Sequence, residues 1–373
     1  MTEKVELLFL REEEMIEAGV LDMASCVKVM EEMFELMGRK DYILGGPNRN
    51  EHGLMLWFNE EEPHKNMPVA GPDRRFMSLI SYLGGRFNVM GNKWYGSNIE
   101  NQKKNLPRSI HTFTLNDKDT GAPLSIMAGN LVSSMRTGAI PGVAARHLAK
   151  KDAKVMGAVG GGAINQSCID AISTTVNSIE KIILFDINEE KGKVIAEKIS
   201  GKTGRPVEVV TDIESCISES DILTVATSGA VKPVIDDKLL KPGALVLLTG
   251  AADLSEEAYN NNRIVADLWS MHKSWMNDGL EHPDGLASIR SWAMSGELLE
   301  LVHEGKYDPS KVDDIGDIVS GERAGRQSED EIIIAIMGGL PTADVAWGYQ
   351  VYENALKKDL GIRLPLWEKS HLV

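Results

Sequence analysis

A glycine-rich turn between two apolar segments is the feature that most constrains how this chain can fold. The apolar segment Val155–Val159 leads directly into the three glycines 160–162. Apolar residues then recur at every fourth position, and they are Ile164, Cys168, Ile172 and Val176. This spacing predicts a helix that buries one face. A second apolar segment, Lys181–Phe185, follows and leads to Asp186, so the order is strand, turn, helix, strand and acid.

This order is typical of a dinucleotide-binding unit in a parallel α/β sheet, and a flexible turn in another α/β unit is the alternative. Glycines let the backbone approach a pyrophosphate. The helix N-terminus, at Ala163 and Ile164, presents N–H groups that have no partner within the helix. Asp186, with Ile187 beside it, stands where an acid binds both hydroxyl groups of a ribose. We therefore expect these residues among the contacts of a bound dinucleotide.

The glycine motif departs from the usual pattern at one position. Gly160 and Gly162 match it, but Asn165 stands where a third glycine or alanine is usual. The helix is therefore expected to lie slightly farther from the sheet. An acid at the end of the second strand favours NAD over NADP. Lys191 and Lys193 are close enough in sequence to leave NADP as the less favoured alternative.

The composition of the 373 residues is that of an ordinary globular protein, with 43% hydrophobic and 25% charged residues. This length suffices for two domains with separate cores. The net charge of −15 argues against nucleic acid or an anionic membrane as a partner, because both require basic patches. We find no apolar signal core and no span long enough for a membrane helix. Three unpatterned cysteines and scattered histidines fit a reducing cytoplasm and predict no metal site.

The pattern of apolar and turn residues before about residue 131 differs from the pattern after it. Residues 11–38 place methionines and other apolar residues at helical spacing, which is typical of a core helix. Residues 59–75 form a polar, proline-containing insert that is expected to be a surface loop or flap. Residues 76–127 contain short apolar runs separated by turn residues, which predicts an antiparallel sheet.

After residue 131, short apolar strands alternate with helical or loop segments. Six strands are expected, at 155–159, 181–185, 207–210, 222–226, 244–248 and 264–266. They predict an α/β fold with a Rossmann-type, doubly wound and mostly parallel sheet over residues 131–319. A second, α+β domain is expected from residues 1–130, completed by residues 320–373. That last segment contains an apolar run at 332–337 and a final helix at 342–358, and the C-terminus is expected to pack on the first domain.

Ligands of doubly wound sheets lie beyond the carboxyl ends of the strands, where two further segments are expected. Thr227 and Ser228 follow one strand and are expected to line that crevice. Asp253 follows another strand and is a candidate general base for an amine or a water molecule. The spacing also fits a helix N-cap, at Asp253 or at Ser255, and spacing alone leaves the two interpretations open.

Several motifs, taken in order, give the chain a resemblance to the ornithine cyclodeaminase/mu-crystallin family over nearly its full length. They are Gly91-Asn92-Lys93-Trp94-Tyr95, Asn116-x-x-x-Thr120-Gly121-x-Pro123, Met135-Arg136-Thr137-Gly138-Ala139, the glycine-rich turn, Gly250-Ala251-Ala252-Asp253 and Gly321-x-x-x-Gly325-Arg326. The insert and the segment 93–98 resemble a longer subgroup of the family that is named for tyramine oxidase. The resemblance implies NAD as cofactor and a homodimer joined through the first domain, which would also bind substrate.

The resemblance also implies roles for individual residues. Asp253 matches the family's catalytic carboxylate, which favours the base over the cap. Lys93 matches a lysine that contacts the substrate near its reacting centre, where burial would lower its pKa and allow proton transfer near neutral pH. Arg136 matches the arginine that binds the substrate carboxylate through a planar pair of donors, with Arg49 as a second contact. Thr137 would then contact the cofactor phosphates.

One segment departs from the ornithine-converting members, which carry an acid followed by Met-Pro upstream of the lysine. Residues 76–85 contain neither an acid nor a proline. The missing acid argues against ornithine itself, and Met77, Leu79 and Tyr82 suggest a different, bulkier substrate. Asp73 and the polar insert are the candidates to compensate.

Together these features predict a cytoplasmic, NAD-dependent oxidoreductase or deaminase that acts on the C–N bond of an amino acid or related amine through an imine. The alternatives are ornithine cyclodeaminase proper, which converts L-ornithine to L-proline and ammonia, a ketimine reductase, and a mu-crystallin-like nucleotide-dependent binding protein. No metal, nucleic acid or membrane is expected as a partner.

Overall fold

The computed structural model describes residues 4–61, 64–227 and 231–372, and the chain falls into two compact units. Unit 1 consists of Met1–Asp22, Asp41–Ser133 and Pro341–Val373, and unit 2 consists of Met23–Lys40 and Ser134–Leu340. Residues 23–40 and 320–340 group with unit 2, whereas the expected domains put them with the first domain.

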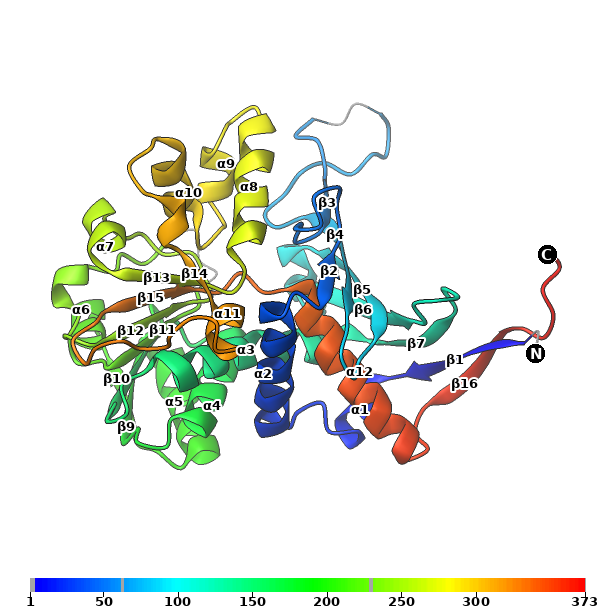
Figure 1. Ribbon diagram of the computed structural model, residues 1–373, viewed down its shortest axis with the longest axis horizontal. Coiled ribbons are helices and arrows are strands. Elements are labelled where there is room, and N and C mark those ends of the chain that lie inside the picture. The colour runs from blue at the N-terminus through cyan, green and yellow to red at the C-terminus, as the bar shows by residue number, and fades with distance from the viewer. Residues whose placement is uncertain (1–3, 62–63, 228–230, 373) are drawn as a thin grey trace. The chain divides into compact units, whose positions relative to one another are not determined.

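Unit 1 is built on a largely antiparallel, eight-stranded sheet (Figure 1). Its strands are β1 (Val5–Leu10), β2 (Tyr42–Leu44), β3 (Leu54–Trp57), β4 (Arg75–Leu83), β5 (Val89–Ser97), β6 (Ser109–Asn116), β7 (Pro123–Ala128) and β16 (Ile362–Trp367). The strand order is β16-β1-β7-β6-β5-β4-β2, with β3 paired to β4, and β1 and β7 run parallel. The helices are α1 (Glu12–Glu17) and α12 (Pro341–Lys357). The expected antiparallel sheet is present as β4 to β7, and β16 returns the C-terminal segment to β1.

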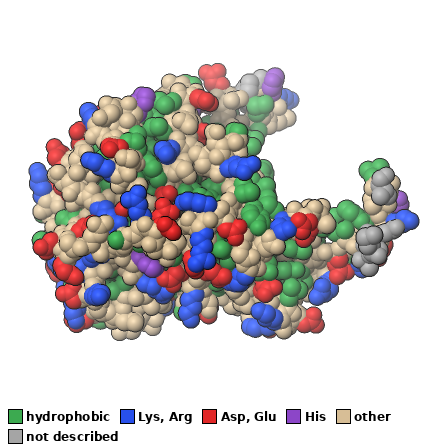
Figure 2. All heavy atoms as spheres, in the orientation of Figure 1, with side chains coloured by type: hydrophobic (Ala, Val, Ile, Leu, Met, Phe, Trp, Pro, Cys, Tyr) green, Lys and Arg blue, Asp and Glu red, His purple; other side chains and the backbone are tan. Residues whose placement is uncertain are grey.

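The two faces of the unit 1 sheet differ because side chains alternate along each strand. One face packs against α12 and carries Leu79, Lys93 and Phe113, which are direct cross-strand partners and are buried. The opposite face carries Ile80 and Trp94, which are 47% and 48% exposed. Figure 2 shows hydrophobic side chains, in green, gathered over β5 and β6. This second face is therefore an exposed apolar surface.

Unit 2 is built on an eight-stranded sheet in which every neighbouring pair is parallel. Its strands are β8 (Val155–Val159), β9 (Lys181–Phe185), β10 (Val207–Val210), β11 (Ile222–Val225), β12 (Leu245–Leu248), β13 (Arg263–Ala266), β14 (Asp313–Asp314) and β15 (Ile333–Ile336). Its helices are α2 (Met23–Gly38), α3 (Gly129–Leu148, which begins in unit 1), α4 (Ala163–Thr175), α5 (Glu189–Thr203), α6 (Ile213–Ser218), α7 (Glu256–Asn261), α8 (Trp269–Glu281), α9 (Ala287–Arg290), α10 (Gly296–His303) and α11 (Ile315–Val319).

The order of the parallel strands, β10-β9-β8-β11-β12-β15-β13-β14, creates a topological switch point. The chain winds outward from β8 through β9 to β10 and then returns to place β11 on the other side of β8. Helices α4 and α5 lie on one side of the sheet in Figure 1, and α7 and α10 lie on the other. The expected doubly wound, Rossmann-type sheet is therefore confirmed, with its ligand crevice predicted beyond the carboxyl ends of β8 and β11.

Two segments differ from their expected organisation. The apolar run at 332–337 is β15, which inserts between β12 and β13 as a fully buried strand of the parallel sheet. The segment 11–38 is two helices, α1 and α2, because the chain turns at Gly19, whose φ is +93°. The methionine stripe belongs to the core as predicted, since Met30, Met33 and Met37 are all buried.

No helix in the described part of the chain is long and apolar enough to cross a membrane. Among the same residues, no three or more His, Cys, Asp or Glu side chains are arranged to hold a metal ion.

Candidate active site

The glycine-rich turn connects β8 to α4 at the switch point of unit 2. Gly160 has φ +90°, and a Cβ there would lie 2.9 Å from the carbonyl oxygen of Ala226, so only glycine fits. The N–H of Gly161 donates to Asp186 Oδ2 at 2.8 Å. Gly162 is exposed, and a Cβ there would have no neighbour within 4 Å. The turn therefore leaves open space in front of the first N–H groups of α4, where Ala163 begins the helix.

Asp186 stands at the end of β9, beside this turn. Its Oδ1 accepts the N–H of Asn188 at 2.9 Å, so both carboxylate oxygens are oriented by backbone donors. Ile187 projects into solvent with 93% of its surface exposed, as an apolar group beside the acid. Lys193 forms ion pairs with Glu189 and Glu190, each at 2.8 Å, and hydrogen bonds to these two acids raise its pKa. This lysine is therefore already neutralised on its own helix.

Asn165 occupies the position of the usual third glycine, and its side chain is fully buried. Its Nδ2 donates to the carbonyl oxygens of Gly160 at 2.7 Å and Val159 at 3.0 Å. Its Oδ1 accepts the hydroxyl of Thr224 at 2.8 Å. The amide thus joins β8, the glycine turn and β11 by hydrogen bonds at the place where the usual motif relies on close packing.

The loops after β11 and β12 meet the glycine turn. A Cβ at Gly160 would lie 3.0 Å from Thr227 Cγ2, and a Cβ at Gly250 would lie 2.9 Å from the backbone nitrogen of Thr227. Thr227 therefore lies close to both glycine-containing loops, as expected for a residue of the crevice. Ser228, which was expected to line the same crevice, lies outside the described residues.

Arg136 and Thr137 lie in α3, which crosses close to α4. A Cβ at Gly138 would lie only 2.4 Å from Ser167 Cβ, so glycine permits this close helix contact. Arg136 is 4% exposed, and its guanidinium packs against Gly339, where a Cβ would lie 2.5 Å from Nη1. Thr137 is half-buried. The structure therefore places Arg136 beside the loop that follows β15.

A buried polar chain that the sequence did not reveal holds this loop in place. Asp267 Oδ2 accepts the N–H of Gly339 at 2.7 Å, and Oδ1 accepts from Leu268 at 2.9 Å. His272 bonds to Asp267 Oδ1 at 2.8 Å through Nε2 and to the hydroxyl of Ser295 at 2.9 Å through Nδ1. All three side chains are at most 1% exposed, so they act as a structural support. An acid directly after the strand 263–266 is the one sequence signal that could have indicated them.

The start of α7 shows that Asp253 is not the N-cap of that helix. Ser255 is the N-cap, because its hydroxyl accepts the N–H of Ala258 at 2.9 Å. Asp253 instead forms an ion pair with Lys232, at 2.5 Å, and lines a cavity of about 300 Å³ with Ala287, Arg290 and Ser291. Burial alone would raise the pKa of Asp253, but hydrogen bonds from Lys232 and Glu297 lower it below its usual value. The carboxylate is therefore ionised and free of a capping role.

Lys93 lies on the buried face of β5 in unit 1 and is 3% exposed. Its Nζ contacts Asp344 Oδ2 at 2.9 Å and donates to the Ser133 hydroxyl at 3.1 Å. Asp344, in the first turn of α12, is 1% exposed and was not among the predicted residues. A single acid in the apolar sequence Pro341–Gly348 was the available signal. This carboxylate stabilises the protonated ammonium and opposes the effect of burial.

Two further residues of unit 1, Arg49 and Asp73, are predicted near the substrate. Arg49 is exposed on the turn after β2, in the left-handed region with φ +56°. Asp73 is engaged by Arg75, Ser97 and Arg108, the last at 2.5 Å, so its carboxylate is occupied by structural contacts.

The segment without an acid is β4, and its side chains alternate between the two faces of the sheet. Met77 and Leu79 are buried on the face of Lys93, whereas Tyr82 lies on the opposite face and donates to Asn88 at 3.0 Å. The three side chains therefore do not line one pocket together.

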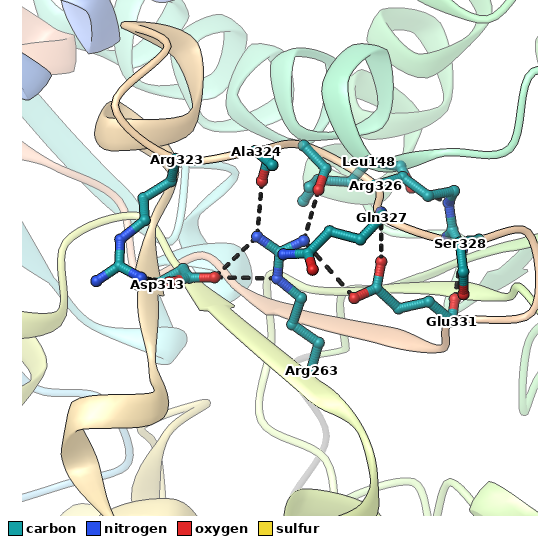
Figure 3. A network of polar contacts seen from close by, with 10 residues as sticks. Leu148, Arg263, Asp313, Arg323, Ala324, Arg326, Gln327, Ser328 and Glu331 are labelled. Carbon is teal, nitrogen blue, oxygen red and sulfur yellow. Dashed lines mark hydrogen bonds and ion pairs between the residues drawn. The ribbon is translucent and has the colours of Figure 1, made fainter.

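The late motif Gly321-x-x-x-Gly325-Arg326 forms a structural network in unit 2 (Figure 3). Arg263 binds Asp313 Oδ2 at 2.8 Å and donates to the carbonyl oxygens of Ala324 and Gly325. Arg326 donates to the carbonyl oxygen of Leu148 at 2.7 Å, at the end of α3. The motif thus fixes the chain that leads into β15.

A parallel sheet with a glycine turn, an open helix N-terminus and an oriented acid defines unit 2 as a Rossmann-type unit. The chain belongs to the ornithine cyclodeaminase/mu-crystallin family, whose model matches residues 20–359. This confirms the family that the motifs suggested.

The relatives of this chain include enzymes of imine and amino-acid chemistry. It is 32% identical to a Delta(1)-pyrroline-2-carboxylate reductase of Bacillus cereus, over 80% of this chain and 87% of the relative. Among solved structures it resembles Delta(1)-pyrroline-2-carboxylate reductase of Thermococcus litoralis in complex with NADH and L-proline, with a TM-score of 0.77, 25% identity, and coverage of 95% and 99% of the two chains. An archaeal alanine dehydrogenase dimer with bound NAD superimposes with a TM-score of 0.78 at 25% identity, covering 97% and 100%.

Proposed function

We propose that this protein is an NAD-dependent oxidoreductase that interconverts an α-amino acid and its α-imino acid by reaction at the C–N bond. The observation that carries the proposal is the combination in unit 2 of a dinucleotide-type turn with Asp253, an ionised carboxylate that lines a cavity. The expected enzyme class and cofactor are confirmed at the level of the family, because the relatives are NAD(H)-binding reductases and dehydrogenases of amino acids.

The residues of unit 2 fit NAD. The open space at Gly162 and the N-terminus of α4 suit a pyrophosphate, with Thr137 as a further contact. Asp186 suits the ribose hydroxyls, and exposed Ile187 offers an apolar surface to the adenine. Bound there, NAD would supply the hydride acceptor for the carbon that bears nitrogen, and NADH would supply the hydride donor for an imine.

The side chains of the protein then hold the substrate and move protons. Arg136, buried and held against Gly339, is assigned the substrate carboxylate, with Arg49 as a second contact. Lys93, protonated beside Asp344, is assigned the donor near the reacting centre. Asp253 is assigned the base that takes a proton from the amine, or from water that attacks the imine. Thr227 is proposed to line the cofactor crevice.

The unit 1 sheet favours an imine substrate over ornithine. Strand β4 presents Met77 and Leu79 on the face of Lys93 and carries no acid that would hold a second amino group. A cyclic or substituted α-imino acid requires only the carboxylate contact and a proton donor at nitrogen. The ketimine reductase direction is therefore preferred over the cyclodeaminase reaction.

The test is a substrate panel with purified protein. With NADH we expect oxidation of the cofactor by Delta(1)-pyrroline-2-carboxylate or another α-imino acid, and with NAD we expect NADH from the matching amino acid. NADH and ammonia in equal amounts from a primary amino acid would identify a deaminating dehydrogenase. Ammonia without NADH from L-ornithine would identify a cyclodeaminase and overturn the preference for imines.

Asp253→Asn distinguishes an enzyme from a nucleotide-dependent binding protein. The amide keeps the shape of the side chain but cannot accept a proton, so turnover should fall by at least 100-fold while NAD binding persists. NAD affinity measured by calorimetry is the control. Full activity of the variant would show that Asp253 is not the base.

We further propose that two copies of the chain associate through the exposed face of the unit 1 sheet. Its outward side chains are large and apolar over neighbouring strands, and Phe76 stacks on Trp94 at 5.8 Å between ring centroids. Trp94→Glu should convert the dimer to a monomer, as measured by light scattering coupled to gel filtration. The exposed Val194→Glu, on α5 of unit 2, is the matched control and should leave the mass unchanged. A wild-type monomer would refute the proposal.

A further inference from the structure

A second carboxyl group lies directly behind Asp253 in unit 2. Glu297, in the first turn of α10, is 8% exposed, and it shares the ammonium of Lys232 with Asp253. Its Oε2 also accepts the N–H of Leu254 at 2.8 Å, so Glu297 fixes the backbone next to Asp253. It is not among the residues that line the cavity beside Asp253. Glu297 therefore lies behind the lining residues Asp253, Lys232 and Arg290.

The charges around this carboxyl pair do not balance. Lys232 lies 2.5 Å from Asp253 and 3.9 Å from Glu297 Oε1. Arg290 of α9 lies 3.2 Å from Glu297 and 3.0 Å from Glu300. Tyr259 of α7 is fully buried nearby, and its pKa is raised by burial and by the negative charges of Glu297 and Asp253. Among the described residues, two cations thus face three carboxyl groups, which leaves an excess of one negative charge and favours one retained proton.

We propose that Glu297 is a positioning residue that shares this proton with Asp253 and thereby sets the base strength of Asp253. The inference rests on the proposed function, in which Asp253 is the base. When Glu297 carries the proton, it donates a hydrogen bond to the Asp253 carboxylate and weakens it as a base. When the proton leaves, two carboxylates face each other and Asp253 becomes the stronger base.

The environment of each carboxyl group assigns the resting place of the proton. Burial, followed by the hydrogen bond with Asp253, raises the pKa of Glu297 to about 6. The pKa of Asp253 is lowered, because the hydrogen bonds from Lys232 and Glu297 outweigh its burial. The proton therefore resides on Glu297 below about pH 6 and leaves the pair above it.

Glu297→Gln tests the inference because the amide imitates the protonated acid. Its carbonyl oxygen still accepts from Leu254, and its NH₂ group still donates toward Asp253, but it cannot titrate. The readout is the ratio of kcat/KM for wild type to that for the variant, measured from pH 5 to pH 8. Other ionising groups contribute equally to both proteins and cancel in this ratio. We expect a ratio near 1 at pH 5 that rises through pH 6 to roughly tenfold at pH 8.

Glu300→Gln is the matched control, since Glu300 lies on the same helix and binds the same Arg290 but makes no bond to Asp253 or Leu254 in the described part of the chain. Its ratio should stay flat. A flat ratio for Glu297→Gln, whatever its size, would reduce Glu297 to a structural support and overturn the inference. If Asp253→Asn retains full activity, the proposed function and this inference fail together. If that variant is inactive and the Glu297→Gln ratio is flat, only the inference fails.

A second readout does not depend on turnover. A carboxyl group whose pKa is raised on folding contributes stability below its unfolded value of 4.5, and this contribution is lost as the pH rises through about 6. The melting temperature of wild type relative to Glu297→Gln should therefore fall between pH 4.5 and pH 6. A difference that does not change with pH would contradict the retained proton.

Discussion

Each unit contains a lysine–aspartate pair in which one member is assigned to the chemistry, Lys93 in unit 1 and Asp253 in unit 2, and the two pairs are built differently. Lys93 and Asp344 in unit 1 lie 2.9 Å apart, with side chains 4% and 1% exposed. Lys232 and Asp253 in unit 2 lie 2.5 Å apart, with side chains 19% and 38% exposed. A buried pair has no water to replace a lost partner, whereas a half-exposed pair does. The buried pair Lys93–Asp344 therefore holds a fixed charge. The more exposed pair Lys232–Asp253 holds a charge that solvent and pH can adjust.

The pair in unit 1 should show the largest effect when it is broken. Asp344→Ala leaves the Lys93 ammonium buried without its counter-charge, which costs about 3–5 kcal/mol in comparable cases. We expect a corresponding loss of stability in calorimetric thermal unfolding, with loss of turnover. Replacing both residues, as Lys93→Met with Asp344→Leu, should recover most of the stability and none of the activity. A single variant as stable as wild type would show that water reaches this site.

Arg136 offers an intermediate test, because it is buried like Lys93 but belongs to unit 2 like Asp253. Gly339→Ala places a Cβ 2.5 Å from its guanidinium, at a residue with φ +80°. Displacing a charge-assisted contact of about 1.5–3 kcal/mol should raise KM for the carboxylate substrate by roughly 10- to 100-fold. The affinity for NAD, measured by calorimetry, should not change.

The matched control for this variant is Gly321→Ala. Gly321 has φ +84°, almost the same backbone conformation, but a Cβ there has no neighbour within 4 Å. Both variants carry the strain of a left-handed alanine, of about 1–2 kcal/mol. Only the variant at Gly339 should change KM. Equal KM values in the two proteins would show that Arg136 is not the carboxylate contact.

The sequence predicted the fold well where periodicity and turn chemistry decide it. The strands β8 to β13 and the glycine turn were predicted because continuous apolar runs are typical of buried parallel strands. The position of β15 was not predicted, since the order of strands in a sheet depends on tertiary packing and leaves no local signal.

The candidate site divides in the same way. Asp253, Lys93 and Arg136 are predicted through family motifs, but Asp344, Glu297 and His272 lie outside those motifs in sequence. Their importance lies in the distances of 2.8–2.9 Å that folding creates to Lys93, Leu254 and Asp267. Spacing along the chain does not encode such contacts.

Breaking the Lys232–Asp253 pair of unit 2 should have the smallest effect on stability, and it should also change the pH dependence of kcat/KM. Lys232→Ala removes a half-exposed ion pair, which is worth about 0–1 kcal/mol. Because the hydrogen bond from Lys232 helps to lower the pKa of Asp253, its loss should move the acid limb of kcat/KM to higher pH. A lowered pKa contributes stability above the unfolded value of 3.8, so the small difference in stability should shrink as the pH falls below 3.8 and vanish once the pH is below the lowered pKa of the folded state.

The salt dependence of stability distinguishes the two ion pairs most directly. Salt weakens the attraction between exposed charges as the Debye length falls from about 10 Å at 0.1 M to about 3 Å at 1 M ionic strength, and it weakens the attraction between buried charges much less. Raising the ionic strength should therefore shrink the stability difference between wild type and Lys232→Ala while leaving the Asp344→Ala difference nearly unchanged. Thermal unfolding of all three proteins over a salt series measures both slopes. Equal slopes would mean that solvent reaches the two pairs alike, and the distinction between a fixed charge and an adjustable one would not hold.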